Sequence, residues 1–115
     1  MKNRPKGPQA ARIRQRKYEL MSRFQIPDDL LPGSLSLQHH RCGRANCHCA
    51  EGERHPKWSL TYMADGKKHV QYIPQHLVNE VRKKVEAGRE YQDAVREVLA
   101  ANAKLLVLAR KQRLI

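Results

Sequence analysis

The sequence predicts an α+β fold: a small three-stranded antiparallel sheet stabilised by a bound zinc ion, with a basic helix before it and a long helix after it. Three observations support this prediction. All three cysteines of the chain fall within residues 42–49. Short segments that alternate between apolar and polar residues lie on both sides of the cysteines, as is typical of strands. An uninterrupted 3–4 spacing of mostly apolar residues then follows Pro74 and indicates a long helix.

The length and composition limit the size of the core. A chain of 115 residues has room for one modest domain with extensions. Aromatic residues make up only 5% of it, and a bound metal is a common way to stabilise so small a core. We therefore expect three parts: a basic arm and helix in residues 1–24, a zinc-binding β domain in residues 25–74, and a long helix in residues 75–115.

The charge of the chain limits its partners. Its 23 Lys and Arg residues outnumber 11 Asp and Glu residues, which gives a net charge of +12. Such a balance favours an acidic partner, most often nucleic acid and less often an anionic membrane. No segment approaches the roughly 20 apolar residues of a membrane span, and no secretory signal is recognisable. Because an odd number of cysteines also argues against a secreted disulfide scaffold, we expect a reduced, cytoplasmic protein with no membrane partner.

The first part of the chain is basic. Residues 1–17 contain no acidic residue, and the segment from Gln9 to about Phe24 can form a helix. One interpretation is an arm that docks on phosphate, as basic segments often do. The other is a solvated, frayed terminus. Under the first interpretation the nucleic-acid-binding residues of this part are Arg12, Arg14, Arg16 and Lys17.

The middle part predicts three strands. Residues 34–39 alternate and lead into the first cysteine. Residues 58–63 and 67–73 form two further strands around a turn at Asp65-Gly66.

That turn allows two hairpin registers. A two-residue turn would set Tyr62 opposite His69 and mix polar with apolar residues on each face. A three-residue loop with Gly66 in the left-handed position of a bulge shifts the pairing by one residue. Because burial should choose between the registers, we predict the bulged hairpin. Its apolar face would consist of Trp58, Leu60, Val70 and Tyr72.

The third part predicts one helix from Pro74 to about Arg110. Proline suits the first turn of a helix because it has no backbone N–H to leave unpaired. Gly88 is the one interruption, and its cost of about 1 kcal/mol relative to Ala leaves a bend or a break open.

Two stripes run along this helix. The first comprises Val78, Val81, Val85, Gly88, Gln92, Val95, Leu99, Asn102, Leu106 and Ala109. The second is apolar throughout and comprises Tyr91, Ala94, Val98, Ala101, Leu105 and Leu108. Two adjacent stripes are more than a lone helix leaves in water. Residues 91–109 are therefore expected to pack on the N-terminal helix, to form a homodimeric coiled coil, or to dock on another protein.

The cysteine cluster predicts a metal site. Clustered thiolates that converge with an imidazole suit tetrahedral zinc, and the lack of any substrate pocket or general base nearby favours a structural Zn²⁺. Unmetallated thiols and iron–sulfur or redox chemistry remain alternatives. His40 and His39 are reserves for the fourth ligand, and His48 is disfavoured because it alternates away from its cysteine neighbours. The predicted ligands are Cys42, Cys47, Cys49 and His55.

Further basic residues lie near these ligands or at the hairpin tip. If the metal fixes the loops, these residues would form one phosphate-facing surface; the alternative is that they are only solvated. They are Arg41, Arg44, Lys57, Lys67 and Lys68. No phosphate-binding glycine loop, paired carboxylates or nucleophile motif is present, so we do not expect an enzyme.

Residues 31–92 resemble a family of small uncharacterised prokaryotic proteins. The resemblance rests on an Arg-Cys-Gly-x-x-Asn-Cys-x-Cys motif at residues 41–49, a Gly-x-x-His step at residues 52–55, and a hairpin that ends at Pro74. The sequence departs from the family at Trp58, where a tyrosine cluster is usual. Members are often associated with transposase-like and other mobile-element genes, so the resemblance implies a role in DNA transactions.

These observations predict a nucleic-acid-binding protein, with DNA as the expected ligand, that acts as an accessory or regulatory factor through phosphate contacts. The alternative is a protein–protein adaptor whose C-terminal helix docks on a larger enzyme such as a transposase-like protein. A third option is association with RNA or the ribosome.

Overall fold

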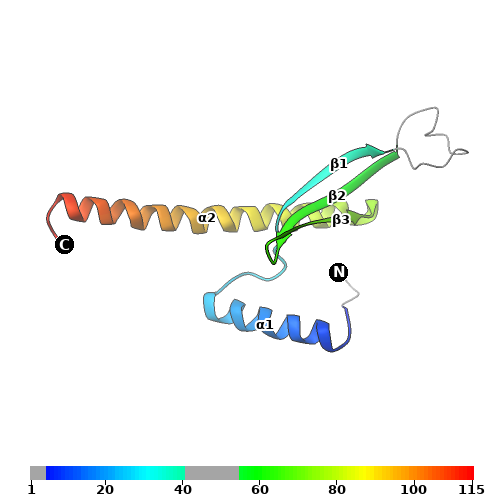
Figure 1. Cartoon of the computed structure of the whole chain (residues 1–115), viewed down its shortest axis with the longest axis horizontal. Coiled ribbons are helices and arrows are strands. Elements are labelled where there is room, and N and C mark those ends of the chain that lie inside the picture. The colour runs from blue at the N-terminus through cyan, green and yellow to red at the C-terminus, as the bar shows by residue number, and fades with distance from the viewer. Residues whose placement is uncertain (1–4, 41–54) are drawn as a thin grey trace, which may run out of the picture.

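The computed structural model describes residues 5–40 and 55–115 and has the expected α+β architecture (Figure 1). An N-terminal helix precedes a three-stranded antiparallel sheet, and a long C-terminal helix follows it. The elements are α1 (Pro8–Phe24), β1 (Ser34–His40), β2 (His55–Ala64), β3 (Lys67–Ile73), the 3₁₀ turn η2 (Gln75–Leu77) and α2 (Val78–Lys111). Pro74 caps η2, in agreement with its expected place at the start of the helical segment.

The strand order is β1-β2-β3, and the predicted register of the β2–β3 hairpin is wrong. The strands are joined by a two-residue turn in which Asp65 and Gly66 have φ angles of 55° and 75°. Positive φ at both central residues matches the right-handed twist of a hairpin without a bulge. Tyr62 is therefore opposite His69, and Ser59 is opposite Tyr72.

Two contacts explain why the unbulged register is adopted. It sets Trp58 opposite Ile73, which is only 8% exposed, so that β3 contributes this residue to the core. The prediction considered Val70 and Tyr72 instead, and these are 62% and 51% exposed. The Tyr62–His69 pair is also favourable, since the two rings stack with centroids 5.2 Å apart.

The core lies between the sheet and the first turns of α2. Figure 1 shows the sheet crossing this part of the helix. Its buried residues are Leu60, Ile73, Val78, Val81 and Val85. Leu31, Leu35, Trp58, Tyr62 and Leu77 pack against them. The first predicted helix stripe is thus confirmed at its beginning, through Gly88, which is also buried.

Gly88 lies inside an uninterrupted α2, so the helix neither breaks nor starts anew at this position. A Cβ atom at residue 88 would overlap the backbone carbonyl of Leu31. The same segment is held by a hydrogen bond of 3.1 Å from the Leu31 N–H to the Lys84 carbonyl. Glycine therefore allows the chain before β1 to approach the helix closely.

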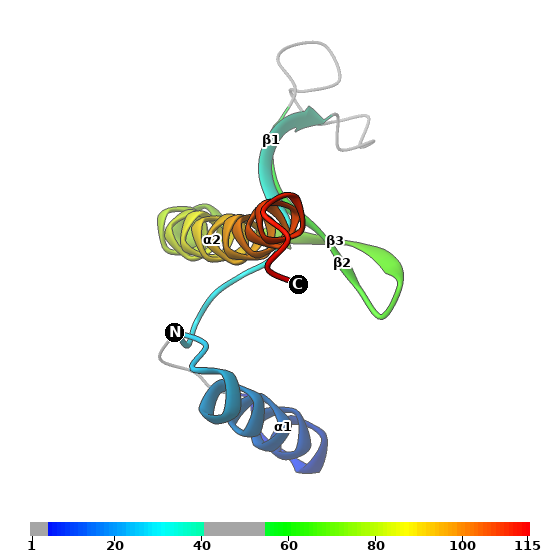
Figure 2. The same ribbon diagram turned by 90° about the vertical axis from the view of Figure 1, so that its left-hand side faces the viewer.

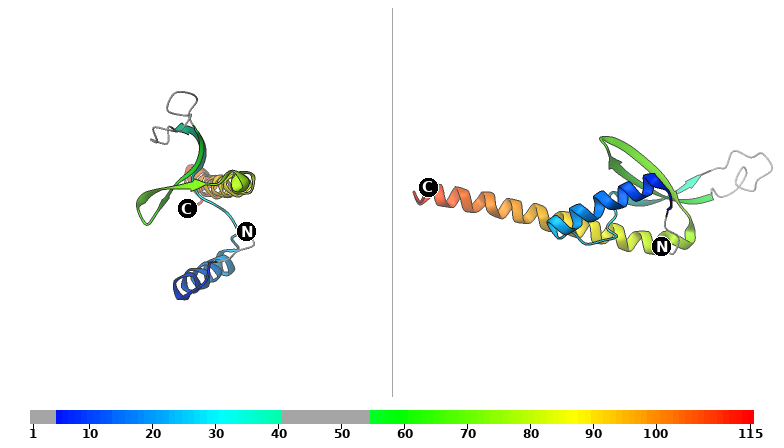
Figure 3. Two further views of the ribbon diagram at one scale, coloured as in Figure 1. Left: turned by 90° about the vertical axis from the view of Figure 1, so that its right-hand side faces the viewer. Right: turned by 90° about the horizontal axis from the view of Figure 1, so that it is seen from below.

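The N-terminal helix is confirmed, and it lies apart from the rest of the protein (Figures 2 and 3). It contains no buried residue, and Gln25 ends it in the left-handed conformation. The distal half of α2 does not pack on it, because every residue from 92 to 108 is exposed. Among the alternatives for the distal half, packing on the N-terminal helix is therefore wrong. In the described part of the chain, no helix carries an apolar stretch that would cross a bilayer.

Candidate nucleic-acid interface

The predicted phosphate-binding residues of α1 lie on an exposed helix. Arg12 and Arg16 are exposed, and Arg14 is half-buried. The Arg14 Nη1 donates a hydrogen bond of 2.8 Å to the Pro5 carbonyl, and the Arg16 Nη1 lies 3.2 Å from a Glu19 carboxylate oxygen. Both interactions are exposed, so a competing phosphate can replace them at little cost in free energy.

Lys17 differs from the arginines because it has an ionic partner. Its Nζ pairs with the Asp28 carboxylate and thereby ties the segment after α1 back to the helix. The hydrogen bond to Asp28 raises the pKa of Lys17 above its ordinary value, and the nearby charge of the same carboxylate acts in the same direction. A raised lysine pKa means that this stabilisation is present at neutral pH and is lost only as the pH rises above the ordinary lysine range. Lys17 is therefore first a structural residue of the arm.

The apolar side of α1 faces the segment that follows it. Ile13, Leu20 and Met21 line an open groove of about 610 Å³, whose other wall includes Ile26 and Leu30. Arg12, Arg16 and Lys17 line the same groove. The arm is thus a small helix-and-loop unit with three of its cations along one groove.

A second basic surface lies on the outer face of the sheet, which points away from α2. Lys57 places its Nζ 5.2 Å from the centre of the half-exposed Tyr72 ring. The same face continues towards the hairpin turn with Val70 and Met63, both more than 60% exposed. Near the turn, Lys68 of β3 lies opposite Met63 of β2. We call these five residues the outer sheet face. Sequence reasoning missed it because the bulged register assigned Val70 and Tyr72 to the core.

The two ends of β2 lie far apart. Its residues 55–64 span about 30 Å at the usual rise of a strand. Lys67 and Lys68 follow the turn at one end, whereas residues 41–54 join β1 to β2 at the other. Lys67 and Lys68 are therefore separated by the length of β2 from the end of the sheet that leads into residues 41–54, and the expectation of one phosphate-facing surface stays a prediction. Arg41 and Arg44 themselves lie outside the described residues.

The predicted metal ligands fall mostly outside the described residues as well. Cys42, Cys47 and Cys49 belong to the connection that is not described. The backbone on both sides of it is described, and the β1–β2 ladder ends with His40 opposite His55. His39 is opposite Pro56, one step further in. Both flanks of the cysteine segment are thus brought together by the sheet.

Comparison with known proteins identifies a family. Residues 9–83 match DUF6788, a domain of unknown function. The match begins in α1 and ends inside α2, so it includes the N-terminal helix that the resemblance in residues 31–92 left out, and it omits the distal half of α2. No curated protein and no solved structure shows a significant match. Since the match covers more than half of its length, the chain belongs to the DUF6788 family of domains of unknown function.

Proposed function

We propose that the protein binds nucleic acid, in the first place DNA, as a non-enzymatic accessory or regulatory factor that contacts the phosphate backbone. The observation that carries the proposal is α1. This 17-residue helix has no buried residue and contains Arg12, Arg14, Arg16, Lys17 and Arg23 against a single acid, Glu19. A helix that makes so little use of core packing and carries so much positive charge is well suited to an anionic polymer.

The outer sheet face supports the proposal as a second contact. Lys57 and Lys68 supply charge at either end, and the exposed Tyr72 ring supplies a stacking surface between them. Phosphate contacts of this kind position a protein on nucleic acid without reading its sequence. The proposal therefore concerns binding to the backbone rather than recognition of a particular site.

A structural Zn²⁺ in the segment after β1 is part of the same proposal. Three cysteines and a histidine are a donor set that fits tetrahedral zinc, and reduced thiolates agree with a cytoplasmic location. The β1–β2 ladder supports it, because the register brings His40 and His55 to opposite positions at the two ends of that segment. The metal would stabilise the connection between two strands and would take no part in chemistry.

The nucleic-acid proposal is tested by the salt dependence of binding to a generic DNA duplex. Each lost phosphate contact lowers the slope of log K against log salt by about 0.9. Replacing Arg12, Arg14 and Arg16 by Ser should therefore lower the slope by about 2–3 and weaken binding at low salt. A single-stranded RNA of the same length, measured in parallel, separates DNA from RNA binding.

The matched control removes the same charge elsewhere. Replacing Arg96, Arg110 and Arg113 by Ser also lowers the net charge by three, but in the distal half of α2 and directly after its end. This control should leave the slope within about one unit of the original value. An equal decrease of the salt slope in the two variants would mean that binding depends on net charge and not on α1. No binding of the original chain at about 50 mM salt would refute the proposal.

The zinc proposal is tested separately by elemental analysis. We expect about one zinc per chain, lost when Cys47 is replaced by Ser. Single Ala variants of His55, His40 and His39 should show which histidine completes the site, with His55 as the expected one. A folded protein that contains no metal would refute this part and leave the nucleic-acid proposal standing.

An adaptor role is the second candidate, and a different observation favours it. The distal half of α2 exposes several large apolar residues, among them Leu99, Leu105 and Leu106, each more than 50% exposed. A surface of this kind is typical of a protein contact. The partner could be a larger enzyme of the transposase-like kind that the family resemblance implies.

A further inference from the structure

The distal half of α2 is a free helix along most of its length. All residues from 92 to 108 are exposed, and Figure 1 shows the helix extending well beyond the sheet. Two of its side chains with large apolar surface, Val98 and Leu105, are 60% and 62% exposed. They belong to the stripe of Tyr91, Ala94, Val98, Ala101, Leu105 and Leu108.

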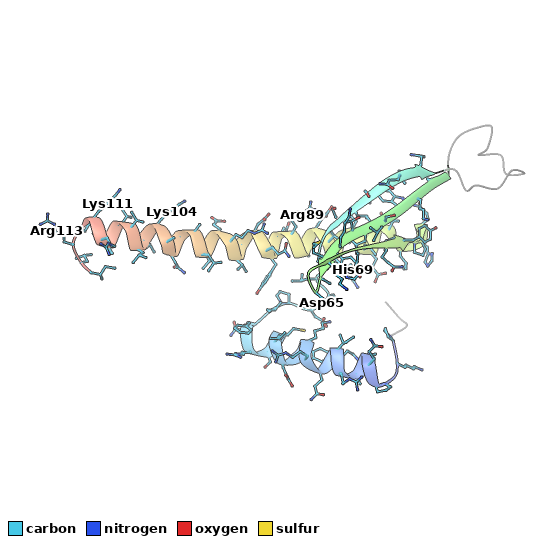
Figure 4. The ribbon with its side chains drawn as sticks, viewed as in Figure 1. Asp65, His69, Arg89, Lys104, Lys111 and Arg113 are labelled. Carbon is cyan, nitrogen blue, oxygen red and sulfur yellow. The ribbon has the colours of Figure 1, made fainter. Side chains whose placement is uncertain are left out.

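A row of charged residues runs beside that stripe with a period of seven. In the heptads of this stripe, Tyr91, Val98 and Leu105 are the first residues. The charged row lies one position before each first residue and consists of Glu90, Glu97, Lys104 and, before the position that would start the next heptad, Lys111. Figure 4 shows Lys104 and Lys111 on the same side of the helix, as this period requires. The row therefore occupies one flank of the apolar stripe, with its two acids towards the sheet and its two bases towards the C-terminus.

These four charges are not used within the described part of the protein. The ion pairs of α2 there join Lys84 to Glu80 and Arg96 to Asp93, and none involves the four residues of the row. Residues seven apart are about 10 Å apart along a helix, too far for an ion pair. The positions three and four residues after Glu97 and Lys104 are all apolar, so no i,i+3 or i,i+4 partner follows either of them.

A second copy of the same helix supplies the missing partners only in the antiparallel direction. In antiparallel coiled coils, the residues on this flank of one helix meet those on the same flank of the other. Glu90 of one copy would then meet Lys111 of the other, and Glu97 would meet Lys104. In a parallel pair, this row would instead face Val95, Asn102 and Ala109, which carry no charge.

The same register gives a consistent apolar seam. It places Val98 of one copy opposite Ala101 of the other, Leu105 opposite Ala94, and Tyr91 opposite Leu108. In two of these three pairs a larger residue lies opposite an alanine, which lets the helices approach closely. Such a pairing is symmetric, because each contact occurs twice around a twofold axis.

The position of the sheet is compatible with this dimer. In the proposed register, the last helical residue, Lys111, lies level with Gly88, where the packing of α2 on the core ends. At 100° per residue, the first residue of the seam, Tyr91, is turned by about 120° from Val85, which faces the sheet. The overlap of residues 88–111 therefore ends where the globular part of each copy begins.

We propose that the protein forms an antiparallel homodimer through the distal half of α2, and that the Glu90–Glu97–Lys104–Lys111 row sets its orientation. The apolar seam provides the affinity. The charges select the helix direction, because the row finds opposite charges in the antiparallel pair and uncharged residues in the parallel one. A single exposed ion pair adds little affinity, but each dimer contains four of them, so the row contributes to the affinity of the antiparallel pair as well as to its direction. The proposal does not depend on nucleic-acid binding.

The test is sedimentation equilibrium of the full chain and of charge-swapped variants over a range of concentrations. E90K/E97K makes the row all basic, and K104E/K111E makes it all acidic. Each alone should raise the dimer dissociation constant at least tenfold, because like charges then meet at all four places. An equimolar mixture should form dimers of one chain of each kind. Circular dichroism is the control for helix content, which should not change.

The quadruple variant E90K/E97K/K104E/K111E is the matched control. It has the composition and net charge of the original chain. Its antiparallel pairs still join position 90 to position 111 and position 97 to position 104, with the two signs exchanged, so it should dimerise like the original. Double variants that dimerise as well as the original chain would overturn the proposal. A monomer at every concentration, or a particle of more than two chains, would also overturn it.

Discussion

The two halves of α2 use the same helical repeat for different purposes. In the proximal half, Val78, Val81 and Val85 are buried against the sheet, each 8% exposed or less. In the distal half, Val98 and Leu99 are 60% and 62% exposed although they continue apolar stripes of similar composition. The comparison shows that an apolar stripe predicts a contact but not whether the contact is made within the chain.

The largest expected difference between the halves concerns a buried charge. Val78→Asp places an unpaired carboxylate at a position that is only 2% exposed, and we expect it to destabilise the fold by about 3 kcal/mol or more. Val98→Asp makes the same chemical change at a position that is exposed in the single chain. At a protein concentration where the chain is monomeric, it should cost less than about 1 kcal/mol of folding free energy. Urea denaturation followed by circular dichroism measures both. Similar losses in the two variants would contradict the division of α2.

A smaller difference is expected for glycine and alanine. In a free helix, Gly→Ala stabilises by about 1 kcal/mol. At Gly88 the new methyl group would overlap the Leu31 carbonyl, so Gly88→Ala should instead destabilise by about 1–3 kcal/mol. The matched control is Ala103→Gly in the distal half, which should cost about 1 kcal/mol through helix propensity alone. A stabilising Gly88→Ala would show that the contact with Leu31 is not made.

The smallest effect on the folded domain is expected from deleting the distal half. A chain that ends after Gln92 keeps all core residues and the hydrogen bond of 3.3 Å from Arg89 to the Gly33 carbonyl. Its melting temperature at low protein concentration should lie within a few degrees of the original value. A loss of the folded domain would mean that residues 93–115 stabilise the core. Deletion also removes the proposed dimer, so the chain should sediment as a monomer.

Predictions from the sequence succeeded where one local pattern determines the outcome. The strands, the long helix and its buried stripe through Gly88 follow from periodicity, and Pro74 marks the start of the helical segment. The hairpin register was wrong because it depends on a choice between two apolar faces. Ile73 rather than Val70 is the β3 residue in the core, and the stacked Tyr62–His69 pair makes the mixed face acceptable.

The candidate interface was predicted only in part. The basic residues of α1 were identified from charge alone, because an exposed helix leaves its composition as the main signal. The outer sheet face was missed because its aromatic member, Tyr72, is assigned to one face or the other by register. The pairing of Lys17 with Asp28 depends on how the chain turns after α1, and no local pattern reports that turn.

By itself, the sequence determined the elements, their order and the excess of positive charge, because these depend on near neighbours and on composition. Only the tertiary structure decided which apolar residues are buried, since burial depends on how far the sheet reaches along α2. That reach ends near Gly88, and the cysteine segment and the tip lysines lie at opposite ends of β2. The physical reason is that one small sheet can cover only the first half of so long a helix.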